Sequence, residues 1–219
     1  NSINVARFLP QAFYYFNAYA QAKKLGKADN LTICVPSGNF GNITAGLFAQ
    51  RMGLPIMNFI AANNANDIFY NYLLSGIYSP KASIQTIANA MDVGDPSNFA
   101  RILDLYKSSH AEICNHISGA TYSDDEIAAT MKKCYEQTGY VLDPHGACGY
   151  QALKDNLKEG ETGVFLETAH PAKFKEKVDA ILSTDIEIPT RLADFMKGKK
   201  QSLEMAADFS AFKQFLLSV

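Results

Sequence analysis

The sequence predicts an α/β fold with a mostly parallel sheet and helices on both faces of that sheet. Residues 31–35 and 56–60 are short apolar runs, which is typical of strands covered on both faces. A glycine loop and a helical segment lie between them, giving the order strand, loop, helix, strand. Residues 163–166 form a third run of the same kind.

An N-terminal helix is predicted over residues 5–25. Its apolar residues recur at helical spacing, at Phe8, Ala12, Tyr15, Phe16 and Tyr19. Pro10 lacks a backbone N–H, so we expect a kink or a restart of the helix near Leu9. Gly26 is expected to end it.

The middle of the chain has a weaker pattern. A helix over residues 43–52 follows the glycine loop, and Gly53 ends it. Between residues 61 and 119 we expect short helices at 67–74 and 98–107, separated by loops rich in Gly, Pro and Asn. The sequence leaves open whether this region is an irregular insertion or a lid.

Stronger helix signals return in the second half. Ser123 and Glu126 have the spacing of a capping box, and the helix that they begin ends at Gly139. A second helix is expected over residues 143–157 and a third over residues 172–182, after the strand at 163–166. The tail from residue 186 to residue 219 is expected to hold helices joined by polar loops.

Composition excludes several classes of protein. Apolar residues make up 47% of the 219 residues, which indicates a globular domain rather than a disordered chain. The net charge of −2 disfavours a nucleic-acid partner, and no apolar run is long enough to span a membrane. The four cysteines form no CxxC pair, so we expect reduced thiols in a cytoplasmic protein and no metal site.

The loop Ser37-Gly38-Asn39-Phe40-Gly41-Asn42 is the strongest candidate site. It joins a buried strand to a helix, at the edge where open α/β sheets bind ligands. Glycines let the backbone approach an anion, and the first amides of the helix point at it. The loop fits a single phosphate or carboxylate. A tight turn in which an asparagine caps the helix explains the spacing equally well.

A second loop, residues 167–171, follows the third predicted strand. Thr168 offers a hydroxyl group there, which either caps a turn or faces a ligand. His170 and His145 each leave the same choice between a helix cap and a general base. His110 and His116 lie in a polar stretch and are expected to be exposed.

The first residues of the chain form a third candidate. Asn4 and Arg7 are three residues apart and share a helix face if a helix begins there. Together with Ser2 they are able to bind a carboxylate or a phosphate. The alternative is a serine that caps the helix and an arginine that lies on the surface.

Five motifs, in this order, resemble those of bacterial-type threonine synthases. They are Asn1-Ser-Ile-Asn-Val-Ala-Arg7, Val35-Pro-Ser-Gly-Asn-Phe-Gly-Asn42, Asn89-Ala-Met-Asp-Val-Gly94, Asp143-Pro-His145 and Thr168-Ala-His-Pro-Ala-Lys-Phe174. The resemblance covers residues 1–182, and the match is looser beyond Ser183.

The resemblance implies the fold of the tryptophan synthase β subunit, which is fold type II of the pyridoxal-phosphate enzymes. It implies conversion of O-phosphohomoserine and water to threonine and phosphate. Gly38, Asn39, Phe40, Gly41 and Asn42 would hold the cofactor phosphate through their backbone amides, and Thr168 would face the pyridine nitrogen. Ser2, Asn4 and Arg7 would contact the substrate.

One expected feature of the family is missing from the sequence. The family's Schiff-base lysine lies in a Phe-Lys-Asp setting upstream of the first motif, and no lysine here stands in that setting. The chain starts at Asn1 instead of Met. We therefore expect residues 1–219 to be the C-terminal portion of the large cofactor-binding domain, and to be inactive alone.

Two other functions remain open at this point. A threonine-synthase-like phospho-lyase would use the same loops and release a keto acid with phosphate. A non-catalytic homologue that lost its lysine would bind a phosphorylated ligand and turn nothing over. The sequence does not indicate an oligomeric state.

Overall fold

The computed structural model describes residues 4–218. The chain divides into two compact units, one ending at Ile186 and the other beginning at Glu187. The first unit contains the sheet and every motif discussed above, so it contains the candidate site.

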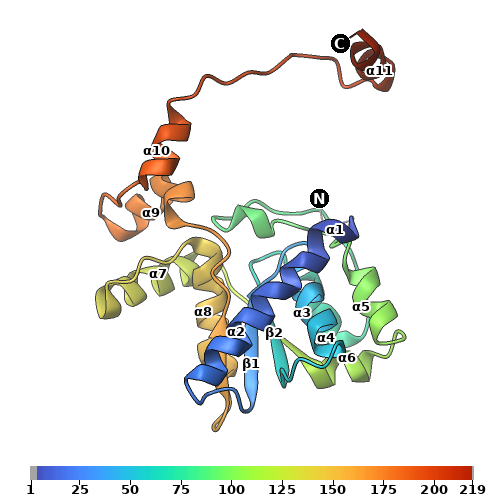
Figure 1. Cartoon of the computed structure of the whole chain (residues 1–219), viewed down its shortest axis with the longest axis vertical. Helices are drawn as coiled ribbons and strands as arrows, with labels where there is room; N and C mark the ends of the chain where they lie inside the picture. Colours follow the sequence, from blue (N-terminus) through green and yellow to red (C-terminus); the bar gives the residue numbers. More distant parts are fainter. Residues whose placement is uncertain (1–3, 219) are drawn as a thin grey trace. The chain divides into compact units, whose positions relative to one another are not determined.

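A parallel four-stranded sheet forms the centre of the first unit (Figure 1). Its strands are β1 (Leu31–Pro36), β2 (Asn58–Asn63), β3 (Ile117–Thr121) and β4 (Thr162–Phe165), in the order β3-β2-β1-β4. All three pairings are parallel. The predicted α/β class with a parallel sheet is confirmed, and the carboxyl ends of all four strands meet at one edge.

Helices connect the strands. Before β3 they are α1 (Val5–Phe8), α2 (Ala12–Lys24), α3 (Gly41–Arg51), α4 (Ile68–Ser75), α5 (Phe99–Leu105) and α6 (His110–His116). After β3 they are α7 (Asp124–Thr138), α8 (Pro144–Asn156) and α9 (Lys175–Leu182). Short 3₁₀ turns lie at η1 (Leu9–Gln11), η2 (Asn89–Met91) and η3 (Pro171–Phe174).

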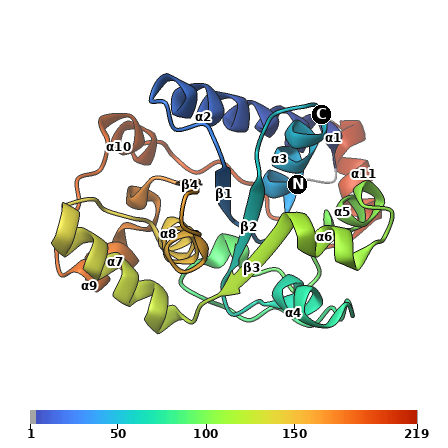
Figure 2. The ribbon, with the colours of Figure 1, turned by 90° about the horizontal axis from the view of Figure 1, so that it is seen from below.

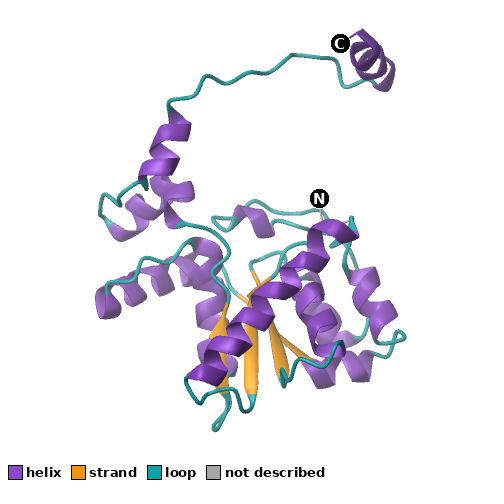
Figure 3. Ribbon diagram, viewed as in Figure 1, coloured by secondary structure: helices purple, strands orange, loops and turns teal. Residues whose placement is uncertain are grey.

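Alternate residues of β1 enter two different cores. Leu31, Ile33 and Val35 pack with α2 and α3, whereas Cys34 packs with α7 and α8. Every residue of β1 is buried because helices cover both faces of the strand. Figure 2 shows α2 and α3 on one side of the sheet and α7 and α8 on the other, and Figure 3 shows the strands enclosed by helices.

Local signals explain several element ends. Ser123 and Glu126 form the predicted capping box at the start of α7, and Gly139 ends that helix in the left-handed conformation with φ 71°. Pro10 lies in η1, between α1 and α2, so the predicted restart is observed. Because a proline cannot donate the helical hydrogen bond, the chain passes through a 3₁₀ turn there.

The structure also differs from the predicted elements. β3 and α6 were not predicted, and the region 61–119 contributes three helices and the start of a sheet strand. β4 is only half-buried, not fully buried as expected, because it lies at the edge of the sheet. The helix expected from residue 172 begins as the 3₁₀ turn η3.

The second unit consists of short helices. They are α10 (Thr190–Met196) and α11 (Phe209–Ser218), joined by a polar segment as the sequence predicts. Neither contributes a residue to the site described below. Within residues 4–218 no helix is long and apolar enough to cross a membrane.

Candidate functional site

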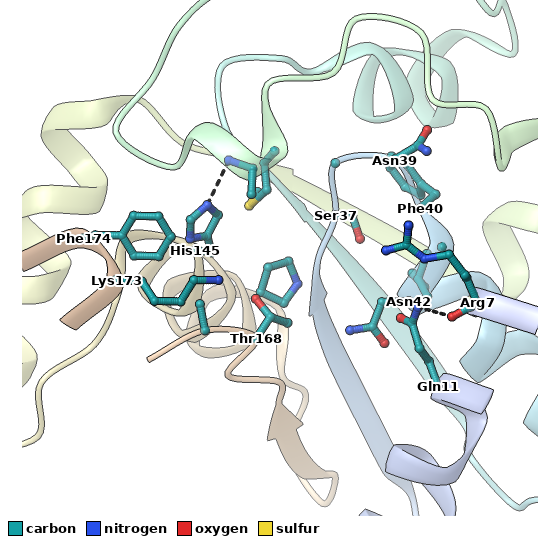
Figure 4. Close-up of a pocket in the computed structure, with 17 residues that line it drawn as sticks. Arg7, Gln11, Ser37, Asn39, Phe40, Asn42, His145, Thr168, Lys173 and Phe174 are labelled. Carbon is teal, nitrogen blue, oxygen red and sulfur yellow. Dashed lines mark hydrogen bonds between the residues drawn. The ribbon is translucent and has the colours of Figure 1, made fainter. Parts of the chain in front are cut away.

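The loops after β1 and β4 line one cleft at the carboxyl edge of the sheet (Figure 4). The cleft has a volume of about 510 Å³, a size typical of small-ligand sites. Residues 36–43, Thr168 and Ala169 line it, and in the close-up Thr168 lies across from Ser37 and Asn42. Two loops that are about 130 residues apart in the sequence therefore face the same space, as the sequence predicts.

The glycine loop leaves the start of α3 open. Phe40 occupies the N-cap position in the left-handed conformation with φ 61°, and no side chain caps the helix. The side-chain oxygen of Asn39 instead accepts hydrogen bonds from Ser97, and that of Asn42 accepts one of 2.8 Å from the Tyr15 hydroxyl. The asparagine-capped turn, which was the alternative for this loop, is therefore not the observed geometry.

Open amides line this loop. The backbone N–H groups of Gly38, Phe40, Gly41 and Asn42 have no hydrogen-bond partner among the described residues. Unpaired N–H groups at a helix start attract anions through their own dipoles and the helix dipole. A left-handed phenylalanine is strained, and strain of this kind is concentrated at binding sites. The loop thus has the geometry of an anion site.

The short turn η2 packs directly over Gly38. A Cβ atom at Gly38 would lie 2.7 Å from Met91 Cα and 2.8 Å from the Ala90 carbonyl oxygen. Only glycine fits at that separation, so its role here is to allow close approach of two backbone segments. Ala90 and Met91 line the cleft as a result.

His145 holds η2 in place. Its Nε2 accepts a 3.1 Å hydrogen bond from Ala90 N–H, and its Nδ1 donates to the Asp143 carboxylate at 2.5 Å. Asp143 is fully buried and also accepts from the amides of His145 and Gly146, which caps α8. Because both ring nitrogens are occupied, His145 positions backbone and is not free to act as a general base.

Thr168 and His170 have different surroundings. Thr168 is exposed and lines the cleft, across from Ser37 and Asn42 of the glycine loop (Figure 4). His170 caps η3, because its Nδ1 accepts a 3.1 Å hydrogen bond from Ala172 N–H. The sequence left open whether His170 is a helix cap or a general base, and the structure shows the helix cap.

Glu167 is a site residue that the sequence analysis did not find. Its Oε1 accepts a 3.3 Å hydrogen bond from Asp143 N–H, while its Oε2 is buried without a partner among the described residues. Burial and the nearby Asp143 carboxylate raise the pKa of Glu167 to about 8. Glu167 is therefore protonated at neutral pH and able to donate a hydrogen bond. The sequence signal that could have identified Glu167 is its position directly before Thr168, in the loop after β4.

The N-terminal candidates separate in the structure. Asn4 caps α1, accepting a 2.9 Å hydrogen bond from Ala6 N–H, so it is not on a helix face with Arg7 as expected. Arg7 lines the cleft, whereas Ser2 lies outside the described residues. Lys173 and Phe174 also line the cleft and were not singled out, although both lie in the last quoted motif.

The other histidines lie away from the cleft. His110 and His116 are half-buried, not exposed as expected, because each ring packs against a tyrosine, Tyr72 or Tyr106. All four cysteines carry free thiols, as predicted. In residues 4–218 no cluster of three or more His, Cys, Asp or Glu side chains could hold a metal ion.

Family models match most of the chain. A model described as "Pyridoxal-phosphate dependent enzyme" matches residues 4–168, and one described as "Threonine synthase, C-terminal" matches residues 146–216. The threonine synthase of Haemophilus influenzae is 48% identical over 99% of this chain. The match covers 50% of that relative, so the chain spans about half the length of the curated relatives it matches.

Solved structures give the same result. The threonine synthase of Escherichia coli superimposes with a TM-score of 0.89 at 42% identity, covering 100% of this chain and 50% of that one. The pyridoxal-phosphate-bound threonine synthase of Brucella melitensis gives a TM-score of 0.90 at 35% identity. The superposition covers 99% of this chain and 51% of the Brucella melitensis chain.

Proposed function

Because the chain belongs to the family of pyridoxal-phosphate dependent enzymes over residues 4–168, we propose that it is the C-terminal half of a threonine synthase. The whole enzyme would convert O-phosphohomoserine and water to threonine and phosphate. One observation supports this most directly: the open amides of Gly38, Phe40, Gly41 and Asn42 line a single cleft together with Thr168. One end of that cleft suits a phosphate group and the other suits a ring nitrogen.

The residues present fit pyridoxal phosphate. The amides of Gly38, Asn39, Phe40, Gly41 and Asn42 would hold its phosphate group, since α3 begins there without a side-chain cap. Thr168 would hydrogen-bond the pyridine nitrogen. A hydroxyl partner leaves that nitrogen largely unprotonated, whereas a carboxylate would favour the protonated ring. This difference suits elimination and replacement chemistry better than transamination.

The remaining site residues shape the cleft. Bound pyridoxal phosphate supplies an electron sink for a carbanion next to the substrate nitrogen. His145 fixes η2 over Gly38 through Ala90, which closes one wall. Burial and the nearby Asp143 carboxylate raise the pKa of Glu167 to about 8, which disfavours a negative charge in the space next to the cleft at neutral pH. Arg7 is the N-terminal side chain best placed for the substrate, with Ser2 and Asn4 as further candidates.

The same proposal covers domain organisation, location and partners. Residues 1–219 would be the C-terminal portion of the cofactor-binding large domain, and the segment carrying the Schiff-base lysine would precede them. Four free thiols agree with a cytoplasmic enzyme. The net charge of −2 agrees with a small-molecule substrate and no nucleic-acid partner.

Product analysis on the full-length protein tests the proposal. We expect O-phosphohomoserine to give threonine and inorganic phosphate in equal amounts, and no keto acid. A keto acid released with the phosphate would indicate a phospho-lyase instead. Pyridoxal-phosphate binding without turnover of O-phosphohomoserine would contradict the proposed reaction, and a non-catalytic homologue would then be favoured.

A further inference from the structure

Tyr15 joins α2 to the glycine loop through its hydroxyl group. The hydroxyl is shared between two oxygens of Asn42, the side-chain Oδ1 at 2.8 Å and the backbone carbonyl oxygen at 2.9 Å. Asn42 is the second residue of α3 and lines the cleft, where it lies across from Thr168 in Figure 4. A residue that does not line the cleft therefore holds one that does.

Packing fixes the ring of Tyr15 in this position. The side chain is fully buried, and it lies against Gly46, one turn after Asn42 in α3. A Cβ atom at Gly46 would lie 2.5 Å from Tyr15 Cε1, so glycine leaves the room that the ring needs. The ring of Phe59 in β2 packs on it with centroids 5.9 Å apart. Burial raises the pKa of the Tyr15 hydroxyl well above its usual range, so the group remains a donor at neutral pH.

The carboxamide of Asn42 is a competitor for the open amides of the glycine loop. Asparagine side chains readily accept hydrogen bonds from their own or neighbouring backbone N–H groups, and asparagine caps helices in this way. The N–H groups of Gly41 and Asn42 have no partner in the described part of the chain. The Asn42 oxygen does not close them in the structure, because the Tyr15 hydroxyl engages it instead.

The other asparagine of the loop is held in a comparable way. The side-chain oxygen of Asn39 accepts from the Ser97 N–H at 2.6 Å and from the Ser97 hydroxyl at 3.0 Å. Both asparagine oxygens that could cap α3 are therefore bound by groups from other segments, Ser97 for Asn39 and Tyr15 for Asn42. This arrangement leaves the start of α3 without a side-chain cap.

We propose that the Tyr15 hydroxyl keeps the anion site open. It holds the Asn42 carboxamide away from the amides at the start of α3, which leaves those amides available to the phosphate group of the cofactor. Tyr15 is a positioning residue in this role, since it acts through Asn42. The inference rests on the proposed function, in which pyridoxal phosphate is the ligand of the glycine loop.

The test compares two aldehydes that differ by the phosphate group, pyridoxal phosphate and pyridoxal. Each is titrated into the cofactor-free full-length enzyme and followed by its absorbance. Tyr15→Phe deletes the hydroxyl and keeps the buried ring. Tyr19→Phe is the matched control, because Tyr19 lies one turn further along α2, is half-buried, and makes no side-chain hydrogen bond among residues 4–218. Urea unfolding of each variant checks that it folds.

For Tyr15→Phe we expect at least about tenfold weaker binding of pyridoxal phosphate, while the affinity for pyridoxal stays within about twofold of the wild type. Tyr19→Phe should not differ from the wild type for either aldehyde. In an Asn42→Ala background, Tyr15→Phe should change the affinity for pyridoxal phosphate by less than about twofold, because the competing oxygen is gone.

Three results would overturn the inference. The first is equal affinity for pyridoxal phosphate in Tyr15→Phe and the wild type. The second is an equal loss for both aldehydes, which would indicate general damage to the cleft. The third is an equal effect of Tyr15→Phe with and without the Asn42 side chain, which would show that Tyr15 does not act through Asn42. If the wild type binds pyridoxal phosphate but makes no threonine, the proposed function fails, while the titrations still decide the role of Tyr15.

Discussion

Gly38 carries the closest backbone contact of the site. Alanine there would bring its Cβ to 2.7 Å from Met91 Cα, so η2 or the glycine loop must move. We expect Gly38→Ala to destabilise the chain by about 1–3 kcal/mol, the usual cost of overpacking. In the full-length enzyme it should weaken pyridoxal-phosphate binding by at least about tenfold, because the amides lose their alignment.

Gly26→Ala is the matched control for that change. Gly26 also has a positive φ, +67°, but nothing lies within 4 Å of the added Cβ. We expect a loss of about 1 kcal/mol in urea unfolding and no change in a cofactor titration. Equal cofactor affinity in Gly38→Ala and Gly26→Ala would contradict the assignment of the glycine loop.

Thr168 is the second residue whose chemistry can be tested alone. In the full-length enzyme, Thr168→Asp should protonate the ring nitrogen, shift the cofactor spectrum and lower kcat by about 10- to 1000-fold, or about 1.4–4 kcal/mol. Thr168→Ser keeps the hydroxyl and should have a mild effect. If Asp is tolerated as well as Ser, Thr168 does not face the nitrogen.

At the scale of elements, Glu167 and Asp143 join the end of β4 to the start of α8. Burial and Asp143 raise the pKa of Glu167 from 4.5 in the unfolded chain to about 8 in the fold. Between these values the folded state binds more protons than the unfolded state. The contribution of the Glu167 carboxyl group to the free energy of unfolding is therefore fully present below about pH 4.5. It is lost as the pH rises through 8.

Glu167→Gln should remove that pH dependence. An uncharged amide resembles the protonated carboxyl group, so the variant should gain on the wild type as pH rises from 5.5 to 8.5. We expect a relative gain of about 1–2 kcal/mol, reduced from the full linkage value because the side chain is partly exposed. Urea unfolding at the two pH values measures it. If the free energy of unfolding changes equally with pH in the wild type and in Glu167→Gln, the pKa of Glu167 is not raised in the fold.

The elements that the sequence predicted well have strong local signals. An apolar run predicts β1, and the glycine loop after it predicts the start of α3. The capping box predicts the start of α7. β3 was missed because Ile117-Ser-Gly-Ala-Thr121 has no continuous apolar run. As an edge strand it needs burial only in part, so its pattern resembles that of a loop.

The geometry of the site was only partly predictable. The sequence placed residues 38–42 and Thr168 at one edge of the sheet, because carboxyl ends of parallel strands meet there. The left-handed Phe40 and the hydrogen bond from Ala90 to His145 depend on packing between distant segments. The pKa of Glu167 likewise depends on Asp143, which is 24 residues away in sequence.

At the scale of the whole molecule, the described chain contains the anion site and the Thr168 hydroxyl but no Phe-Lys-Asp segment. We therefore expect the purified chain, mixed with pyridoxal phosphate and borohydride, to give only weak labelling spread over several surface lysines. Covalent attachment at one position requires a lysine whose amine the fold aims at the aldehyde, and our proposal puts that lysine in the preceding half.

Mass spectrometry after reduction gives the stoichiometry and the position of the adduct. One equivalent of cofactor on a single lysine, together with threonine production, would show that this chain is complete as an enzyme. Lys173 is the informative position, since it is the lysine that lines the described cleft. Preferential labelling of Lys173 would contradict the proposal that the anchoring lysine lies in the preceding half, whereas weak labelling spread over several lysines would agree with it.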